Sequence, residues 1–110
     1  AVRQLAFMVL TRAGFHVESA ADGAEALRLA ANATTPFSLL LTDVVMPGMS
    51  GREVAETLTM RQPGMKVLYM SGHADASLAR HGVTGPGIAM LPKPFRPETL
   101  LARVRELLAE

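Results

Sequence analysis

The chain has 110 residues, nearly half of them apolar, and a formal net charge of +1. Its length suits one domain with a single core, and its near-neutral charge excludes a strongly basic surface for binding nucleic acid. The absence of cysteine excludes disulfides and thiolate metal sites, and no apolar run approaches the roughly 20 residues that span a membrane. No signal-peptide pattern opens the chain. We therefore expect a soluble, cytoplasmic domain over residues 1–110.

The first predicted element is an amphipathic helix over residues 2–13, whose apolar residues recur at helical spacing. Gly14 follows it, and glycine favours the left-handed conformation that ends many helices. A short strand over residues 16–20 and a helix over residues 24–32 come next. Asp22 can cap this second helix, because its carboxylate can accept hydrogen bonds from the free amides of the first turn.

Three further strands are predicted, and each is followed by a polar residue that could carry chemistry. The strands and the residues after them are residues 37–42 with Asp43, residues 66–70 with Ser71, and residues 88–92 with Lys93. Apolar runs bounded by proline and glycine are typical of parallel strands that are covered on both faces. Open α/β folds place their chemistry at the carboxyl edge of such a sheet, so we expect the carboxylate, hydroxyl and amine to meet there.

Helices separate these strands. Ser50 and Glu53 have the spacing of a capping box for the next helix, and Pro97 suits the first turn of the last one. Glycine and proline interrupt residues 72–87, where residues 76–80 predict a short helix. Strands that alternate with helices predict a doubly wound parallel sheet. Such a fold normally opens with a central strand, whereas this chain opens with a helix, so we expect its first strand to be absent from the sequence.

An acid, a hydroxyl and an amine at neighbouring strand ends indicate a site that handles phosphoryl groups. Asp43 would act as the nucleophile and form an acyl phosphate. Lys93 would place its positive charge against the phosphoryl oxygens, and Ser71 would donate a hydrogen bond to one of them. A divalent cation, which we expect to be Mg2+, would bind Asp43 together with further oxygen ligands.

Four segments of the sequence resemble the receiver domain of two-component response regulators, and the likeness covers the whole chain. They are residues 20–27 (AADGAEAL), 43–51 (DVVMPGMSG), 69–72 (YMSG) and 93–95 (KPF). The resemblance implies a flavodoxin-like, CheY-like doubly wound parallel sheet that takes a phosphoryl group from a histidine kinase or a histidine phosphotransfer domain. It also implies that Asp43 is the phosphoacceptor, Ser71 the switch hydroxyl and Lys93 the lysine that contacts the phosphate.

The same resemblance implies further details. The Lys93–Pro94 peptide bond would be cis, and the backbone carbonyl of Val45 would bind the metal. The domain would assist its own phosphotransfer without being a turnover enzyme, and it could be fused to a kinase or an effector domain. From the near-neutral charge and the short apolar runs we expect that it binds neither nucleic acid nor membrane. Residues 71–73, 80–83 and 92–95 are most similar to receivers of hybrid sensor histidine kinases.

Two features depart from the family pattern. The family's Mg2+-binding acidic pair has no counterpart, since the earliest acids, Glu18 and Asp22, follow the first helix. We expect that pair upstream of Ala1, and without it metal binding and phosphorylation should be impaired. Met90 stands where the family usually has an aromatic switch residue. Methionine can still swing between inward and outward packing, so we expect Met90 to act with Ser71 in the switch.

Other interpretations stay open. An aspartate after a strand is most often a cap, and only its joint placement with a hydroxyl and an amine favours a phosphoacceptor. One alternative is a receiver-like interaction module that works without phosphorylation. Another is a dehalogenase-like phosphohydrolase, which needs a second acid where Val45 stands. His73 and His81 have no third ligand in phase, so we expect them to be ordinary polar residues.

Overall fold

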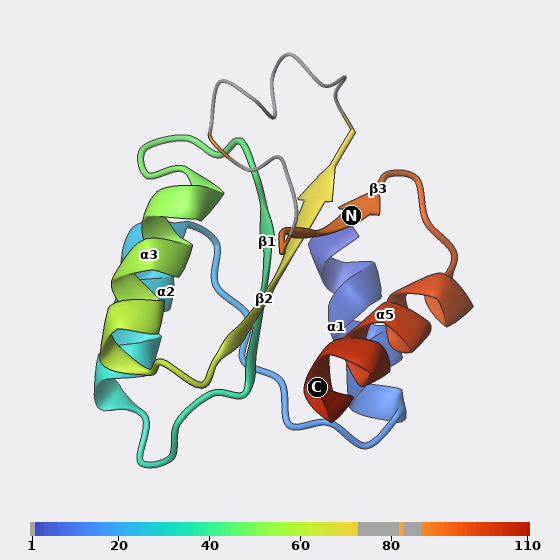
Figure 1. Ribbon diagram of the computed structural model, residues 1–110, viewed down its shortest axis with the longest axis horizontal. Helices are drawn as coiled ribbons and strands as arrows, with labels where there is room; N and C mark the ends of the chain where they lie inside the picture. Colours follow the sequence, from blue (N-terminus) through green and yellow to red (C-terminus); the bar gives the residue numbers. More distant parts are fainter. Residues whose placement is uncertain (1, 73–81, 83–86) are drawn as a thin grey trace.

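The computed structural model describes residues 2–72, 82 and 87–110, which form a parallel sheet with helices on both faces (Figure 1). In chain order the elements are α1 (Val2–Arg12), α2 (Gly23–Asn32), β1 (Leu39–Asp43), α3 (Gly51–Arg61), β2 (Lys66–Ser71), β3 (Ala89–Pro92) and α5 (Pro97–Ala109). α1 and α5 lie on one side of the sheet, and α2 and α3 lie on the other. None of the described helices is long and apolar enough to cross a membrane. The predicted α/β layering is confirmed.

The strand order is β1-β2-β3, and both neighbouring pairs are parallel. In this register Asp43 lies opposite Met70, and Ser71 lies opposite Pro92, the residue before Lys93. Parallel strands end at the same edge of a sheet, so the register delivers all three polar residues to one edge.

Side chains of the strands alternate between two cores, as the apolar runs predicted. Leu39 and Leu41 pack on the side of α1 and α5, whereas Leu40 packs on the side of α3. Leu68 and Leu91 are completely buried in the first of these cores. Full burial of a leucine side chain contributes about 1.5–3 kcal/mol, so a one-residue slip in register would be costly.

The strand predicted over residues 16–20 is wrong. The structure has no strand there, and within the described residues this segment pairs with no neighbour. Phe15 instead caps the C-terminus of α1, because its amide donates to the Leu10 carbonyl at 3.1 Å. Phe15 and Val17 do pack against the α1/α5 core. The apolar alternation therefore identified the inward side chains, but alternation alone does not provide the backbone partner that a strand requires.

The predicted helix caps are confirmed. The Ser50 hydroxyl accepts a hydrogen bond from the Glu53 amide at 3.2 Å, and the Glu53 carboxylate accepts one from the Ser50 amide at 2.9 Å, which completes the capping box of α3. Asp22 accepts from the Glu25 amide at 2.8 Å. The Glu25 carboxylate accepts a hydrogen bond from the Ala21 amide at 2.6 Å.

Two other helix ends also agree with the sequence. Gly14 follows α1 with a φ of 99°, a left-handed conformation that glycine adopts without strain. Pro97 is the first residue of α5. The short helix predicted over residues 76–80 lies outside the described residues.

Candidate functional site

The carboxyl edge of the sheet brings the three predicted site residues together. Asp43 ends β1, Ser71 ends β2, and Lys93 follows β3. Lys93 Nζ lies 2.6 Å from Asp43 Oδ1, which makes an ion pair across the edge. The Lys93 amide donates to the Ser71 carbonyl at 2.8 Å, so the middle strand fixes the lysine backbone. The Lys93–Pro94 bond is cis, as the family resemblance implied.

The ion pair is partly open to solvent. The Asp43 side chain is 38% exposed and that of Lys93 is 29% exposed, yet the Oδ1 atom of Asp43 is itself buried. Among the described residues this oxygen accepts no hydrogen bond of good geometry, so its contact with Lys93 is ionic. A buried carboxylate oxygen normally has hydrogen-bond partners, and lacking them is unfavourable unless charge compensates. Here the positive charge of Lys93 supplies that compensation.

The segment after Asp43 is held at both ends. The Val44 amide donates to the Met70 carbonyl at 3.2 Å, which extends the β1–β2 ladder one residue beyond the aspartate. The Gly51 amide donates to the Val44 carbonyl at 3.0 Å, which joins the start of α3 to the same point. Val45, by contrast, has a side chain that is 47% exposed. The two hydrogen bonds at Val44 therefore fix the backbone next to Asp43.

Two structural contributors to the site were missed by the sequence interpretation. The Thr42 hydroxyl is buried and donates to the Asp43 carbonyl at 3.0 Å. Gly51 is buried beside the same carbonyl, and a Cβ atom at this position would overlap the carbonyl oxygen. The signal was present but not used: glycine is the default residue where one backbone approaches another closely.

The oxygen atoms that the site offers are of the kind that Mg2+ prefers, but there are few of them. Asp43 offers a carboxylate and Val45 a backbone carbonyl, both hard oxygen ligands. Within residues 2–72, 82 and 87–110, no three His, Cys, Asp or Glu residues form a cluster that could hold a metal. Glu18 pairs with His16 at 2.9 Å, and Asp22 caps α2 as predicted, so both acids are engaged in local structure. His73 and His81 lie outside the described residues.

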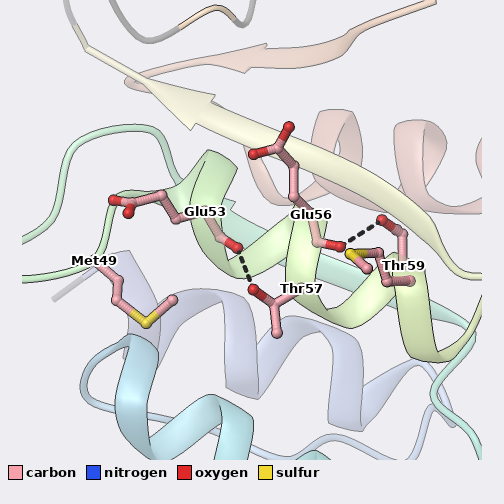
Figure 2. A pocket seen from close by; sticks show the side chains of 6 residues that line it. Met49, Glu53, Glu56, Thr57 and Thr59 are labelled. Atoms are coloured by element: carbon pink, nitrogen blue, oxygen red, sulfur yellow. Dashed lines mark hydrogen bonds between the residues drawn. The ribbon is translucent and has the colours of Figure 1, made fainter.

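A hollow on α3 is lined by other residues than Asp43, Ser71 and Lys93. It has a volume of about 610 Å³ and is lined by Met49, Glu53, Glu56, Thr57, Thr59 and Met60 (Figure 2). The Thr57 hydroxyl donates to the Glu53 carbonyl at 2.9 Å, and the Thr59 hydroxyl donates to the Glu56 carbonyl at 3.3 Å (Figure 2). The hydroxyls are therefore satisfied within the helix, and the hollow presents no reactive constellation.

Comparison with known proteins agrees with this geometry. The model of the response regulator receiver domain matches residues 1–105. The response regulator receiver protein CpdR of Brucella abortus is 34% identical over 107 residues, which cover 97% of this chain and 88% of CpdR. The sensor kinase CckA of the same organism is 33% identical over 108 residues, which cover 98% of this chain but 11% of the kinase.

Solved structures agree as well. Chemotaxis response regulator CheY4 of Vibrio cholerae superposes with a TM-score of 0.81 at 33% identity, over 96% of this chain and 88% of that one. The receiver domain of the hybrid histidine kinase CckA gives a TM-score of 0.78 at 35% identity, over 97% and 89% of the two chains. These neighbours confirm the flavodoxin-like, CheY-like fold class.

Receiver domains are signalling domains of two-component systems that interact with histidine kinases or phosphotransfer proteins, and they generally bind Mg2+ at an acidic phosphorylation site. The fold, the strand-end acid and the match over nearly the whole sequence agree with one another, and this chain belongs to the family of response regulator receiver domains.

Proposed function

We propose that this domain accepts a phosphoryl group on Asp43 from the phosphohistidine of a histidine kinase or a histidine phosphotransfer domain, and that it then changes conformation. The observation that supports this most directly is the 2.6 Å ion pair between Asp43 and Lys93 at the carboxyl edge of the sheet. An acid held beside a fixed cation at this edge has the charge arrangement that phosphoryl transfer needs.

In the proposed reaction a carboxylate oxygen of Asp43 attacks phosphorus. The P–O bond to Asp43 forms as the P–N bond of the phosphohistidine breaks, and the electron pair of that bond returns to the imidazole nitrogen. Lys93 remains beside the reacting oxygens and offsets the negative charge that would otherwise repel the carboxylate. The Ser71 hydroxyl then donates a hydrogen bond to a phosphoryl oxygen.

Asp43 and the Val45 carbonyl would hold Mg2+, together with the acidic pair that the family resemblance implies and with phosphoryl oxygens. When bound, the metal would neutralise phosphoryl charge alongside Lys93. A single carboxylate gives a weaker site than several, so Mg2+ should bind with low affinity where that pair is lacking. The Asp43–Lys93 ion pair would compete with the metal for the same oxygen.

The conformational step would follow from the new charge at the sheet edge. Attraction between the phosphoryl group and the Ser71 hydroxyl would favour one of two arrangements of this edge, and Met90 on β3 would repack accordingly. The domain would not be a turnover enzyme, because Val45 stands where a dehalogenase-like phosphohydrolase needs a second acid.

The test is intact-mass analysis, after incubation with acetyl phosphate and Mg2+, of the natural protein that contains residues 1–110, so that any acidic pair upstream of Ala1 is included. We expect one phosphoryl adduct on the wild type and none on Asp43→Asn. Asp22→Asn is the matched control, because it alters an acid that caps α2 and should leave the adduct intact. An adduct of undiminished yield on Asp43→Asn would refute the assignment, as would the absence of an adduct on the wild type.

A receiver-like interaction module that needs no phosphorylation is the second candidate. It is favoured by the absence, within the described residues, of a three-acid cluster at the site. Titration of the protein with Mg2+ in an isothermal calorimeter discriminates between the phosphoacceptor and the interaction module. Binding that is lost in Asp43→Asn supports the phosphoacceptor, whereas a chain that binds neither Mg2+ nor phosphoryl supports the interaction module.

A further inference from the structure

Tyr69 is the only tyrosine of a chain that has no tryptophan. It lies in β2, two residues before Ser71, and is 6% exposed. Side chains two residues apart on a strand point to the same face of the sheet, so Tyr69 and Ser71 share the face that α3 covers. The ring therefore packs in the core beneath α3, in one cluster with Ala55 of that helix.

The register places this ring between the strand of the acid and the strand of the lysine. Tyr69 lies opposite Thr42 of β1 on one side and opposite Met90 of β3 on the other. It is buried in one cluster with Val44, the residue directly after Asp43, and Met90 packs against that cluster. Because protein interiors are close-packed, a shift of either neighbouring segment has to be accommodated by the ring.

The phenol end of the ring lies within electrostatic reach of α3. Burial raises the pKa of Tyr69 above its usual value near 10, while the positive charge of Arg52 lowers this pKa and the negative charge of Glu56 raises it. These two residues belong to the first turns of α3 and form an ion pair at 3.3 Å. The ring thus connects the sheet edge to the N-terminal half of α3.

We infer that Tyr69 is a positioning residue that couples phosphorylation of Asp43 to α3, with Met90 as its flexible neighbour. The inference rests on the function proposed for Asp43. Movement of Val44 and Ser71 around a phosphoryl group would displace the ring, and displacement of the ring would shift Ala55 of α3, which is buried in the same cluster. The neighbouring strand would thereby provide the aromatic side chain that position 90 lacks.

The first test uses Tyr69 as its own reporter, because all tyrosine emission of the chain comes from this residue. Acetyl phosphate and Mg2+ are added to the full chain while intact mass and tyrosine emission are followed together. We expect emission to change in proportion to the adduct and to stay constant in Asp43→Asn. An adduct with unchanged emission overturns the inference alone. Absence of any adduct overturns the function of Asp43 and, with it, the inference.

The second test separates a coupling role from ordinary packing. Hydrogen exchange of the α3 amides is measured with and without acetyl phosphate in three variants: Tyr69→Phe, Tyr69→Leu and Phe15→Leu. Phe15 is the matched control, since it is a partly buried aromatic residue in the core on the opposite face. In the wild type we expect phosphorylation to change exchange rates by about fivefold or more.

Tyr69→Phe should keep this response because the ring remains, and Phe15→Leu should keep it because the ring lies elsewhere. Tyr69→Leu should form the adduct but lose the response of α3. A full response in Tyr69→Leu, or an equal loss in Phe15→Leu, would show that the ring acts only as core packing.

Discussion

Gly51 lies against the backbone carbonyl of Asp43, so closely that a Cβ atom at position 51 would overlap the oxygen and lie 3.1 Å from the Thr42 hydroxyl. The first turn of α3 and the end of β1 therefore meet backbone to backbone. This contact determines where the carboxylate stands relative to Lys93, because the acid is the last residue of its strand.

Gly51→Ala should destabilise the fold and displace the acid. The added methyl group forces the helix and the strand apart, and overpacking of this kind costs about 1–3 kcal/mol. Urea denaturation measures the loss. Gly64→Ala is the control, because a Cβ atom there meets nothing within 4 Å. Equal stability of the two variants would contradict the close approach.

Lys93→Met should slow phosphorylation far more than it changes stability. The variant keeps the bulk of the side chain but removes the cation beside Asp43, and loss of one group that stabilises developing charge costs about 100-fold in rate. The ion pair is partly exposed, so the free energy of unfolding should change by no more than about 1 kcal/mol. The rate of adduct formation with acetyl phosphate measures the effect.

Lys66→Met serves as its control. Lys66 is the only other lysine and lies at the first residue of β2, at the opposite end of the sheet from the site. It should phosphorylate at the wild-type rate. If both lysine variants slowed the reaction equally, net charge rather than the local contact would be responsible.

Removal of divalent metal should reduce the adduct. Mg2+ held by Asp43 and the Val45 carbonyl would neutralise phosphoryl charge, which Lys93 alone does only in part. Adduct yield with acetyl phosphate should fall when EDTA is added and return when Mg2+ is restored in excess. If EDTA left the adduct yield unchanged, Lys93 alone would be sufficient to neutralise the phosphoryl charge and no metal would take part.

Alkaline pH should reveal the burial of Tyr69. Its folded-state pKa is raised, chiefly by burial, so the unfolded chain releases the phenolic proton first as the pH rises above about 10. The stabilising contribution is therefore complete below that pH and is lost as the pH approaches the folded-state pKa. Denaturant unfolding across this range should show a steeper decline for the wild type than for Tyr69→Phe. Parallel curves would contradict a raised pKa.

Much of the site followed from the sequence because its residues stand at strand ends. The apolar run before Ser71 predicted the bounds of β2 well, and parallel strands necessarily bring Asp43 and Lys93 to the same edge. The strand predicted over residues 16–20 failed because pairing depends on a neighbour that side-chain alternation does not reveal. The close approach of Gly51 was missed for a related reason, since it depends on how a helix meets a strand.

The position of the Tyr69 ring could not be predicted from the sequence either. From the sequence its ring is one more apolar residue in a buried run. Only the register shows that it lies between the strand of Asp43 and Met90, and only the packing of α3 brings it near Arg52.

Chemical identification of the phosphorylated residue tests the central claim most directly. The full chain is treated with acetyl phosphate and Mg2+, the acyl phosphate is reduced with borohydride, and peptides are sequenced by mass spectrometry. Reduction converts an aspartyl phosphate to homoserine, so the account predicts homoserine at position 43 and nowhere else. Homoserine at another aspartate, or a phosphoryl group that survives on a serine or histidine while Asp43 stays unmodified, would contradict it.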